Sequence, residues 1–370
     1  MRTLIVGGTG LTGPILVRGL LDRGHEVVVL HSGRHETSEI PPEVEHIHVD
    51  VHRQKQLREA LAGRKFDVAL SMHGRLVEVA AALKGHTGRL ISVGGECVYR
   101  GWLRIGDPNL FQTMEPSPVP VAEDSPLEER GRDPFVDRML EAEEYVMRCH
   151  TEGHFDVTHF RFTIGYGPRQ PGPTEWSVVR RILDGRKRFL LPLGGQVIVS
   201  RGYAENCAHG ILLAVDQPEA SAGEIYNVCD ETLLTNRQWV ETISRIMEHP
   251  FELIDVPGEI AEPGHLCASP PFLNYPFHEV MSLEKIKRHL GYEQVVAPEP
   301  ALRKTIDWLL ANHPEPGSAM EYNIGDRFDY AAEDRLIDSL HALRKALRAE
   351  RHGTPYQWKH PYPHPARSKS

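Results

Sequence analysis

The stretch that decides the fold is Ile5-Val-Gly-Gly-Thr-Gly-Leu-Thr-Gly13, close to the start of the chain. A short apolar run, residues 3–6, leads into it, and residues 14–21 continue at helical spacing. Three glycines recur at every third position: Gly7, Gly10 and Gly13. A strand that turns through glycines into a helix directs unpaired backbone N–H groups and the positive end of the helix dipole at one point. Because a pyrophosphate fits that point, the stretch predicts a dinucleotide-binding site.

Around this stretch, the first half of the chain alternates apolar strands with helical patterns. We predict strands at 2–6, 26–30, 45–49, 66–71, 88–93 and 156–163, and helices at 12–23, 53–62, 75–84 and 135–150. Strands separated by helices form right-handed crossovers, which place the strands parallel and cover both faces of the sheet. The sequence therefore predicts an α/β fold with a doubly wound parallel sheet.

Beyond the first half, the pattern is less regular. Residues 100–134 are rich in Pro, Gly and acidic residues and predict a long loop, and residues 188–199 form a hydrophobic segment. Further helices are predicted at 174–184, 204–215, 236–247, 283–290 and 300–310, with a strand at 224–228. The segment 331–350 is amphipathic and predicts one more helix.

Composition excludes several classes of protein. The chain has 370 residues with a formal net charge of −9, which argues against nucleic acid or an anionic membrane as the main partner. It has no apolar run long enough to span a bilayer, and its first residues already belong to the first strand. Its 5 cysteines form no Cys-x-x-Cys pair, which suits reduced thiols. We expect a cytoplasmic protein with a small-molecule substrate, and homo-oligomer formation is left open.

Several landmarks in the correct order resemble the extended short-chain dehydrogenase/reductase superfamily, in its NAD-dependent epimerase/dehydratase branch. After the glycine stretch they are Asp50-Val51, Ser92-Val-Gly-Gly-Glu-Cys-Val-Tyr99, Glu123-Asp-Ser-Pro-Leu127, Leu140-Glu-Ala-Glu143 and Gly165-Tyr-Gly-Pro168. The resemblance implies a Rossmann core (1–165 and 197–230), a smaller C-terminal substrate-binding lobe (166–196 and 231–315) and a helical, Pro- and His-rich tail (316–370). It also implies cofactor contacts from Gly7, Thr9, Gly10, Leu11, Thr12, Gly13, His31, Ser32, Arg34, Asp50, Val51, Ser71 and Ser92.

The chain departs from this superfamily at the proton relay, which is usually a Ser or Thr with Tyr-x-x-x-Lys. Aligned on the landmarks, these three positions hold Gly95, Phe135 and Met139. A shifted alignment does not restore the relay, because no tyrosine lies between residues 99 and 145 and no lysine between 84 and 187. The sequence therefore predicts an atypical member that lacks the usual relay.

The end of the second strand indicates which nicotinamide cofactor is preferred. NAD-using members carry an Asp there, which accepts from the ribose 2′-hydroxyl and would repel a 2′-phosphate. Here the strand ends in Leu30-His-Ser-Gly-Arg34, without an acid, and Arg34 can give charge-assisted hydrogen bonds to a phosphate. We therefore favour NADP over NAD; an ordinary solvated loop is the alternative.

Three residues are candidates for the missing chemistry. Glu96 follows Gly94-Gly95 where the substrate is expected to meet the nicotinamide, and a desolvated carboxyl can serve as acid or base, or simply bind loop amides. Tyr99 and Tyr166 are weaker catalytic candidates, since both could be packing residues. In the second lobe, Arg201 and Tyr203 are candidate substrate contacts, with Arg201 as an anion clamp or an ordinary ion pair.

The 21 histidines invite a metal interpretation. His46 and His48 alternate on a strand, and His360 and His364 are four apart in a Pro-rich segment that cannot be a helix. Neither pair belongs to a convincing set of ligands, so we expect no metal site.

These observations leave three functional classes open. The first is an NADP-dependent oxidoreductase of epimerase/dehydratase type, which acts on a small polar substrate with Glu96 in the role of the missing relay. The second is a lyase, isomerase or cyclase without net redox chemistry on the same fold. The third is a non-catalytic sensor or interaction protein that binds NADP(H).

Overall fold

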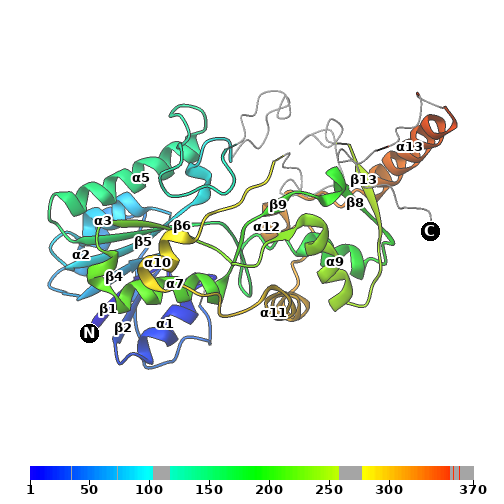
Figure 1. Cartoon of the computed structure of the whole chain (residues 1–370). Helices are drawn as coiled ribbons and strands as arrows, with labels where there is room; N and C mark the ends of the chain where they lie inside the picture. Colours follow the sequence, from blue (N-terminus) through cyan, green and yellow to red (C-terminus); the bar gives the residue numbers. More distant parts are fainter. Residues whose placement is uncertain are drawn as a thin grey trace, which may run out of the picture.

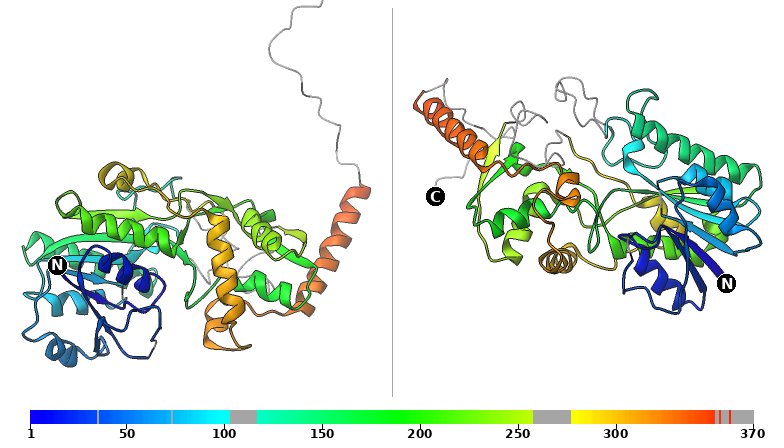
Figure 2. Two further views of the ribbon diagram at one scale, coloured as in Figure 1. Left: turned by 90° about the horizontal axis from the view of Figure 1, so that it is seen from below. Right: turned by 180° about the vertical axis from the view of Figure 1, so that it is seen from behind.

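A computed structural model of the chain describes residues 1–34, 36–72, 74–102, 117–257 and 277–350, together with residues 353 and 358. It has two lobes along one long axis, and the N-terminus lies in the larger of them (Figure 1). The larger lobe contains the main sheet. The smaller lobe is built from shorter strands and helices, and a C-terminal helix projects from its far end (Figure 2).

The larger lobe is a seven-stranded sheet in which every pairing is parallel, with the order β11-β6-β5-β4-β1-β2-β3. The strands are β1 (Arg2–Val6), β2 (Glu26–His31), β3 (Glu45–His48), β4 (Val68–Ser71), β5 (Arg89–Gly95), β6 (Asp156–Phe162) and β11 (Glu224–Val228). This is a Rossmann-type doubly wound sheet, so the predicted fold class is confirmed. The central strands β1, β2 and β4 are almost entirely apolar and buried, as parallel strands covered on both faces are, whereas only Ile47 of the edge strand β3 is buried.

Helices cover both faces of this sheet (Figure 1). One face packs against α2 (Gln54–Leu61), α3 (Leu76–Leu83) and α5 (Pro134–Thr151). The other packs against α1 (Gly13–Leu21), α7 (Ala204–Asp216) and α10 (Glu284–Leu290). The carboxyl ends of the strands remain uncovered by these helices, and a ligand of this fold binds there.

The short helix α8 (Pro218–Ser221) is joined to the sheet by a buried arginine of β5. The guanidinium of Arg89 donates to the carbonyl oxygens of Ala214 and Pro218 and to Oγ of Ser221. It also donates to Oγ1 of Thr158 on β6. These hydrogen bonds compensate the guanidinium charge of Arg89, a residue that is only 6% exposed. They also fix α8 and the C-terminal end of α7 against the edge of the sheet.

The smaller lobe has its own core of apolar and aromatic side chains, which include Trp176, Phe189, Trp239, Ile243 and Leu302. Its helices are α6 (Trp176–Leu183), α9 (Asn236–Ile246) and α11 (Pro298–Ala311). Its strands pair two by two: β8 (Arg188–Pro192) with β13 (Glu252–Val256), β9 (Ile198–Val199) with β12 (Leu234–Thr235), and β7 (Ile164–Tyr166) with β10 (Arg201–Tyr203). The predicted hydrophobic segment 188–199 is therefore two strands, separated by a 3-10 turn, η2 (Leu193–Gly195).

Two parts of the predicted domain division are wrong. Helix α10, assigned from sequence to the substrate lobe, packs on the Rossmann sheet through Ile286 and Leu290. The segment from residue 316, assigned to a separate tail, is fixed to the smaller lobe over α12 (Ala319–Asn323) and the first half of α13 (Tyr330–Ala349). Its attachment is electrostatic as well as apolar, because Arg181 of α6 donates to the buried carboxylates of Asp326 and Glu333.

The long loop predicted at 100–134 is described only outside residues 103–116. Its later part returns to the core, where Val121 bridges to Met281 and Leu127 to Tyr99. Within the ranges given above, no helix is both long and apolar enough to cross a membrane. The expected tail residues His360 and His364 lie outside the described residues.

Candidate functional site

The three spaced glycines of the first turn lie in different local environments. Gly7 has a φ of 83°, which a residue with a side chain rarely adopts, and its N–H donates to Leu30 O of β2. A Cβ at Gly13 would stand 2.1 Å from the carbonyl oxygen of Gly8, so the start of α1 can pack there only as glycine. A Cβ at Gly10 would meet nothing within 4 Å. The turn therefore leaves open space at the position where a pyrophosphate is expected to approach the backbone.

A second observation fits a dinucleotide at this turn. Ser71, the last residue of β4, is fully buried, and its Oγ has no hydrogen-bond partner among the described residues. A buried hydroxyl without a partner indicates a missing ligand or water. Ser92 at the end of β5 differs, because its Oγ already shares a hydrogen bond with Nδ1 of His159, 2.8 Å away. Ser71 therefore fits the predicted cofactor role, and Ser92 is held by the protein itself.

The remaining predicted cofactor residues surround the same edge of the sheet. Thr9 and Leu11 are partly exposed on the turn, Thr12 caps α1, and Val51 is buried. Asp50 accepts from the backbone N–H and Nδ1 of His52, and these hydrogen bonds hold its pKa below the usual range. Ser32 and Arg34 are exposed after β2. No carboxylate lies at the end of β2, and the side chain there is His31, which is 6% exposed.

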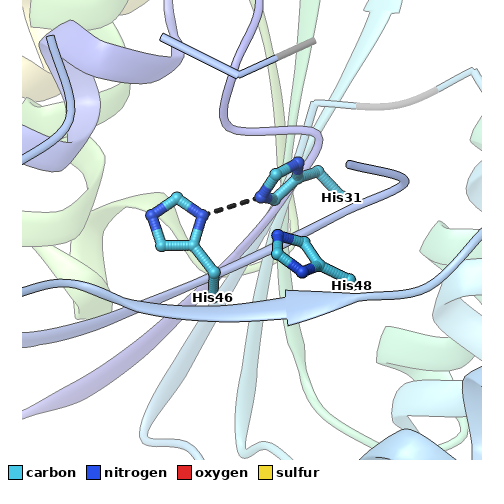
Figure 3. A group of neighbouring side chains, drawn as sticks. All are labelled: His31, His46 and His48. Carbon is cyan, nitrogen blue, oxygen red and sulfur yellow. Dashed lines mark hydrogen bonds between the residues drawn. The ribbon is translucent and has the colours of Figure 1, made fainter. Parts of the chain in front are cut away.

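His31, predicted from the sequence as a cofactor contact, has two histidine neighbours. It lies against His46 and His48 of β3, and the three rings face one another at the outer edge of the sheet (Figure 3). Burial and the two neighbouring imidazoles lower the pKa of His31. The sequence showed the His46–His48 pair without its third member, because the register of β2 against β3 was needed to bring His31 opposite His48.

At the carboxyl end of β5 the structure brings together residues that stand where the family relay is expected. The terminal methyl group of Met139, on α5, lies 3.5 Å from the point that a Cβ of Gly95 would occupy. Phe135, one turn earlier on α5, is 49% exposed. Neither side chain can take up or release a proton.

Glu96 is the next residue after Gly95 and opens the 3-10 turn η1 (Glu96–Val98). Its side chain is only partly exposed, and desolvation raises the pKa of its carboxyl to about 7. A carboxyl with that pKa is present in both protonation states at neutral pH, which is what proton exchange with a substrate requires. Among the candidate residues, Glu96 has the ionisation behaviour of an acid–base group.

The two candidate tyrosines are held inside the protein. Tyr99 is fully buried; its hydroxyl donates to Oδ1 of Asn227 and accepts from Arg161. The hydroxyl of Tyr166, also fully buried, donates to Asp230. Burial raises the pKa of Tyr99 to about 12 and also raises the pKa of Tyr166 well above its usual value. Both arrangements suit a framework role.

Arg201 of β10 is 4% exposed rather than open to an anion. Its Nη2 donates to Oδ1 of Asn236, 2.7 Å away, and its guanidinium lies 4.3 Å above the ring of Trp239. Desolvation lowers its pKa to about 10, against the opposing effect of nearby acids, first among them Glu175. Tyr203 is buried as well and donates to Glu205.

Arg201 is surrounded by polar residues that no sequence motif marks. Several of their atoms are buried and lack hydrogen-bond partners among the described residues, as does Nε of Arg201 itself: Oε2 of Glu175, Nδ2 of Asn236, Nε1 of Trp239 and Oε1 of Glu279. The charge of Glu96 raises the pKa of Glu279, so these two carboxyls interact across the lobes, although desolvation is the larger cause. No motif marks Glu279, which reaches the site only because its backbone pairs with Ile198 and Ser200.

Comparison with known proteins agrees with this arrangement. The model of the NAD-dependent epimerase/dehydratase family matches residues 3–84 and 68–229, more than half of the chain. The chain belongs to the NAD-dependent epimerase/dehydratase family. The family match includes β1 to β11, so it contains the complete sheet and its carboxyl edge.

The proteins similar to this chain have low sequence identity to it. The chain is 25% identical to a UDP-glucose 4-epimerase of Streptomyces lividans over 293 residues, 72% of this chain and 88% of that protein. It is 26% identical to an uncharacterized protein of Sinorhizobium fredii over 165 residues, 40% of this chain and 45% of the relative, so it spans less than half of that relative's length. A dTDP-glucose 4,6-dehydratase structure from Streptomyces venezuelae, solved with NAD, has a TM-score of 0.65 at 21% identity and covers 84% of this chain and 98% of its own.

Proposed function

We propose that this member of the family is an atypical NADP-dependent oxidoreductase of epimerase/dehydratase type. It acts on a small polar substrate, and Glu96 transfers the proton that Tyr-x-x-x-Lys transfers elsewhere. The observation that carries the proposal is the position and pKa of Glu96: a partly exposed carboxyl at the end of β5 whose pKa is raised to about 7. When bound, the cofactor would supply hydride transfer at its nicotinamide ring.

The residues of this chain would bind the cofactor, transfer the proton and limit the access of water. The turn at Gly7–Gly13 would bind the pyrophosphate through its backbone N–H groups, with Gly10 providing the open approach. As a carboxylate, Glu96 would accept a proton from a substrate hydroxyl; as a neutral acid, it would return one to a substrate oxygen. Met139 and Phe135 would add apolar surface near this point, which limits the access of water and favours a raised pKa at Glu96.

The preference for NADP rests on the end of β2. The position at the end of β2 where NAD-using members carry an Asp holds His31, so the carboxylate that would repel a 2′-phosphate from that position is missing. Arg34 and Ser32 are exposed at the same edge and would donate to the phosphate, with His31 beside them. Two similar structures, a UDP-glucuronic acid 4-epimerase and a dTDP-glucose 4,6-dehydratase, were solved with NAD, so the proposed preference for NADP rests on the end of β2 alone.

The polar character of the substrate is supported by the atoms around Arg201. Buried donors and acceptors without partners are costly unless a ligand or water satisfies them. Donors are present on Trp239 and Asn236, and acceptors on Glu175 and Glu279. A substrate with several hydroxyl groups would satisfy both kinds, because each hydroxyl donates one hydrogen bond and accepts others.

The test is a mass-spectrometric substrate screen with stoichiometric NADPH deuterated at C4 of the nicotinamide. We expect deuterium to appear in one product, and Glu96→Gln to slow its formation by about 10²- to 10⁴-fold with NADPH affinity unchanged. Glu219→Gln, an exposed carboxylate on α8, is the matched control and should be neutral.

Other outcomes distinguish the competing functions. A product without deuterium that forms equally well in protein freed of nucleotide would show lyase, isomerase or cyclase chemistry. An epimerase-type cycle also leaves its product unlabelled, because the hydride returns to the substrate, but it requires bound NADP⁺. NADPH binding without any product, across a broad substrate set, would favour a sensor. Unchanged turnover in Glu96→Gln would overturn the assigned role of Glu96.

A further inference from the structure

Three histidines converge at the outer edge of the Rossmann sheet, away from the carboxyl end of β5. His46 and His48 are two residues apart on β3, so their side chains stand on the same face of the strand. His31 at the end of β2 is the register partner of His48. The ligand atoms of the three rings all lie within 4.8 Å of one another, and Nε2 of His31 is 2.7 Å from Nδ1 of His46 (Figure 3).

This arrangement suits a metal better than it suits packing. Imidazole rings in a core usually contact apolar neighbours, whereas here each ring contacts the other two, with centroids 4.8 to 6.0 Å apart. Two ligands at i and i+2 on one strand and a third on the neighbouring strand can enclose one ion from one side. Three neutral imidazoles are the ligand set of one class of zinc site.

We propose that His31, His46 and His48 bind one divalent transition-metal ion of the zinc class. Zn–N bonds of about 2.0 to 2.1 Å in a tetrahedron require ligand nitrogens about 3.4 Å apart, a spacing that lies between the shortest and the widest separation in the trio. A carboxylate is also at hand, because Oε1 of Glu36 lies 3.3 Å from Nε2 of His48. Glu36 would complete the four-coordinate site.

Binding requires only local rearrangement. The hydrogen bond between His31 and His46 would be replaced by two bonds to the metal. A metal on Nε2 of His31 places the proton on Nδ1, so the N–H of Gly33, now 3.2 Å from Nδ1, would have to turn away. His46, His48 and Glu36 are exposed and free to adjust, while His31 is held by burial.

The site would be independent of the proposed reaction. It lies on the edge strand β3 and its neighbour β2, and the strands β1 and β4 separate β2 from β5 and Glu96. It is close to Ser32 and Arg34, where the cofactor's 2′-phosphate is expected. A bound metal would therefore fix the loop after β2, and its most direct influence would be on the cofactor end rather than on the substrate.

The experiment uses the full chain without a polyhistidine tag, stripped with a chelator and dialysed. Zn²⁺ is titrated by calorimetry, and Co²⁺ is added to record the visible bands of four-coordinate cobalt. We expect one high-affinity ion per chain. His46→Asn and His48→Asn, both at exposed positions, should each weaken it by about 100-fold or more and abolish the cobalt bands.

His154→Asn is the matched control, because His154 is also an exposed histidine beside a glutamate, Glu152, but among the described residues it belongs to no cluster of three potential metal ligands. It should leave the high-affinity ion unchanged. The proposal is overturned if the chain binds no stoichiometric ion, or if the trio variants bind it as tightly as the control. It is also overturned if the trio variants, free of metal, lose NADPH affinity while Zn²⁺ binding is unaffected, since the trio would then be a phosphate site.

Discussion

The terminal methyl group of Met139 faces Gly95 at 3.5 Å, measured to the point that a Cβ of Gly95 would occupy. These are two of the three positions at which relatives are expected to carry a proton relay, and here neither offers a group that can exchange a proton. The adjacent Glu96 is desolvated, and the desolvation of that carboxyl has consequences for stability as well as for chemistry.

The first prediction concerns the pH dependence of stability. Because desolvation raises the pKa of Glu96 from 4.5 to about 7, the folded protein binds a proton that the unfolded chain releases over this interval. The free energy of unfolding should therefore fall as pH rises from about 4.5 to about 7. In Glu96→Gln this contribution is absent, so the variant should gain up to about 3 kcal/mol relative to wild type between pH 4 and pH 8. Urea denaturation at both pH values measures the difference; an equal difference at both would show that Glu96 ionises normally.

A second prediction separates the two spaced glycines of the turn. Gly10→Ala places its methyl group in open space, so the thermal unfolding midpoint should stay unchanged while nucleotide affinity falls. Gly13→Ala would place a methyl group against the carbonyl of Gly8 and should destabilise the protein by about 1–3 kcal/mol. Calorimetric unfolding and NADPH fluorescence titration measure the two effects. Full nucleotide affinity in Gly10→Ala would mean that the ligand does not approach this backbone.

The third prediction concerns cofactor choice. Arg34→Ala should weaken NADPH binding by about 10- to 100-fold and leave NADH binding unchanged, because one charge-assisted hydrogen bond contributes about 1.5–3 kcal/mol. Arg53→Ala, at another arginine on the same side of the sheet, is a control for net charge. If the wild-type protein bound NADH more tightly than NADPH, the NADP assignment would be wrong.

A fourth prediction tests the attachment of the C-terminal segment. Arg181 is 1% exposed, and its guanidinium donates to Asp326 and Glu333. Arg181→Met leaves these carboxylates without their main partner, so it should cost about 3–5 kcal/mol. Hydrogen exchange should rise first in α13. Arg335→Met, on the exposed side of the same helix, should change neither quantity.

The sequence predicted those parts of the molecule whose structure depends on residues close together in the chain. The central strands of the main sheet are apolar along most of their length, and the turn at Gly7–Gly13 is one continuous stretch, so both could be identified without distant contacts. Helix α10 was placed in the wrong lobe for the opposite reason. Its apolar stripe at Ile286 and Leu290 shows that it is buried on one side but not which element buries it.

The candidate site was predicted in part for the same physical reason. Glu96 follows a strand directly and could be found from that position alone. Glu279 reaches the site through backbone bonds to Ile198 and Ser200, about eighty residues away, and no local pattern specifies such a pairing. The third histidine, His31, is an intermediate case, because its position could be predicted only by pairing two strands. Aligning the carboxyl ends of the two predicted parallel strands would have brought it to His48.

Arg89 also bears on the order in which the chain can fold during its synthesis. Its guanidinium lies on β5, yet three of its acceptors are in Ala214, Pro218 and Ser221. A ribosome-bound chain that has not yet reached these residues holds six strands of the sheet and an arginine whose charge lacks most of its final partners. We therefore expect the nucleotide-binding sheet to reach its final stability only after residue 221 has been translated, and a nascent chain halted before that point should remain a substrate for chaperones.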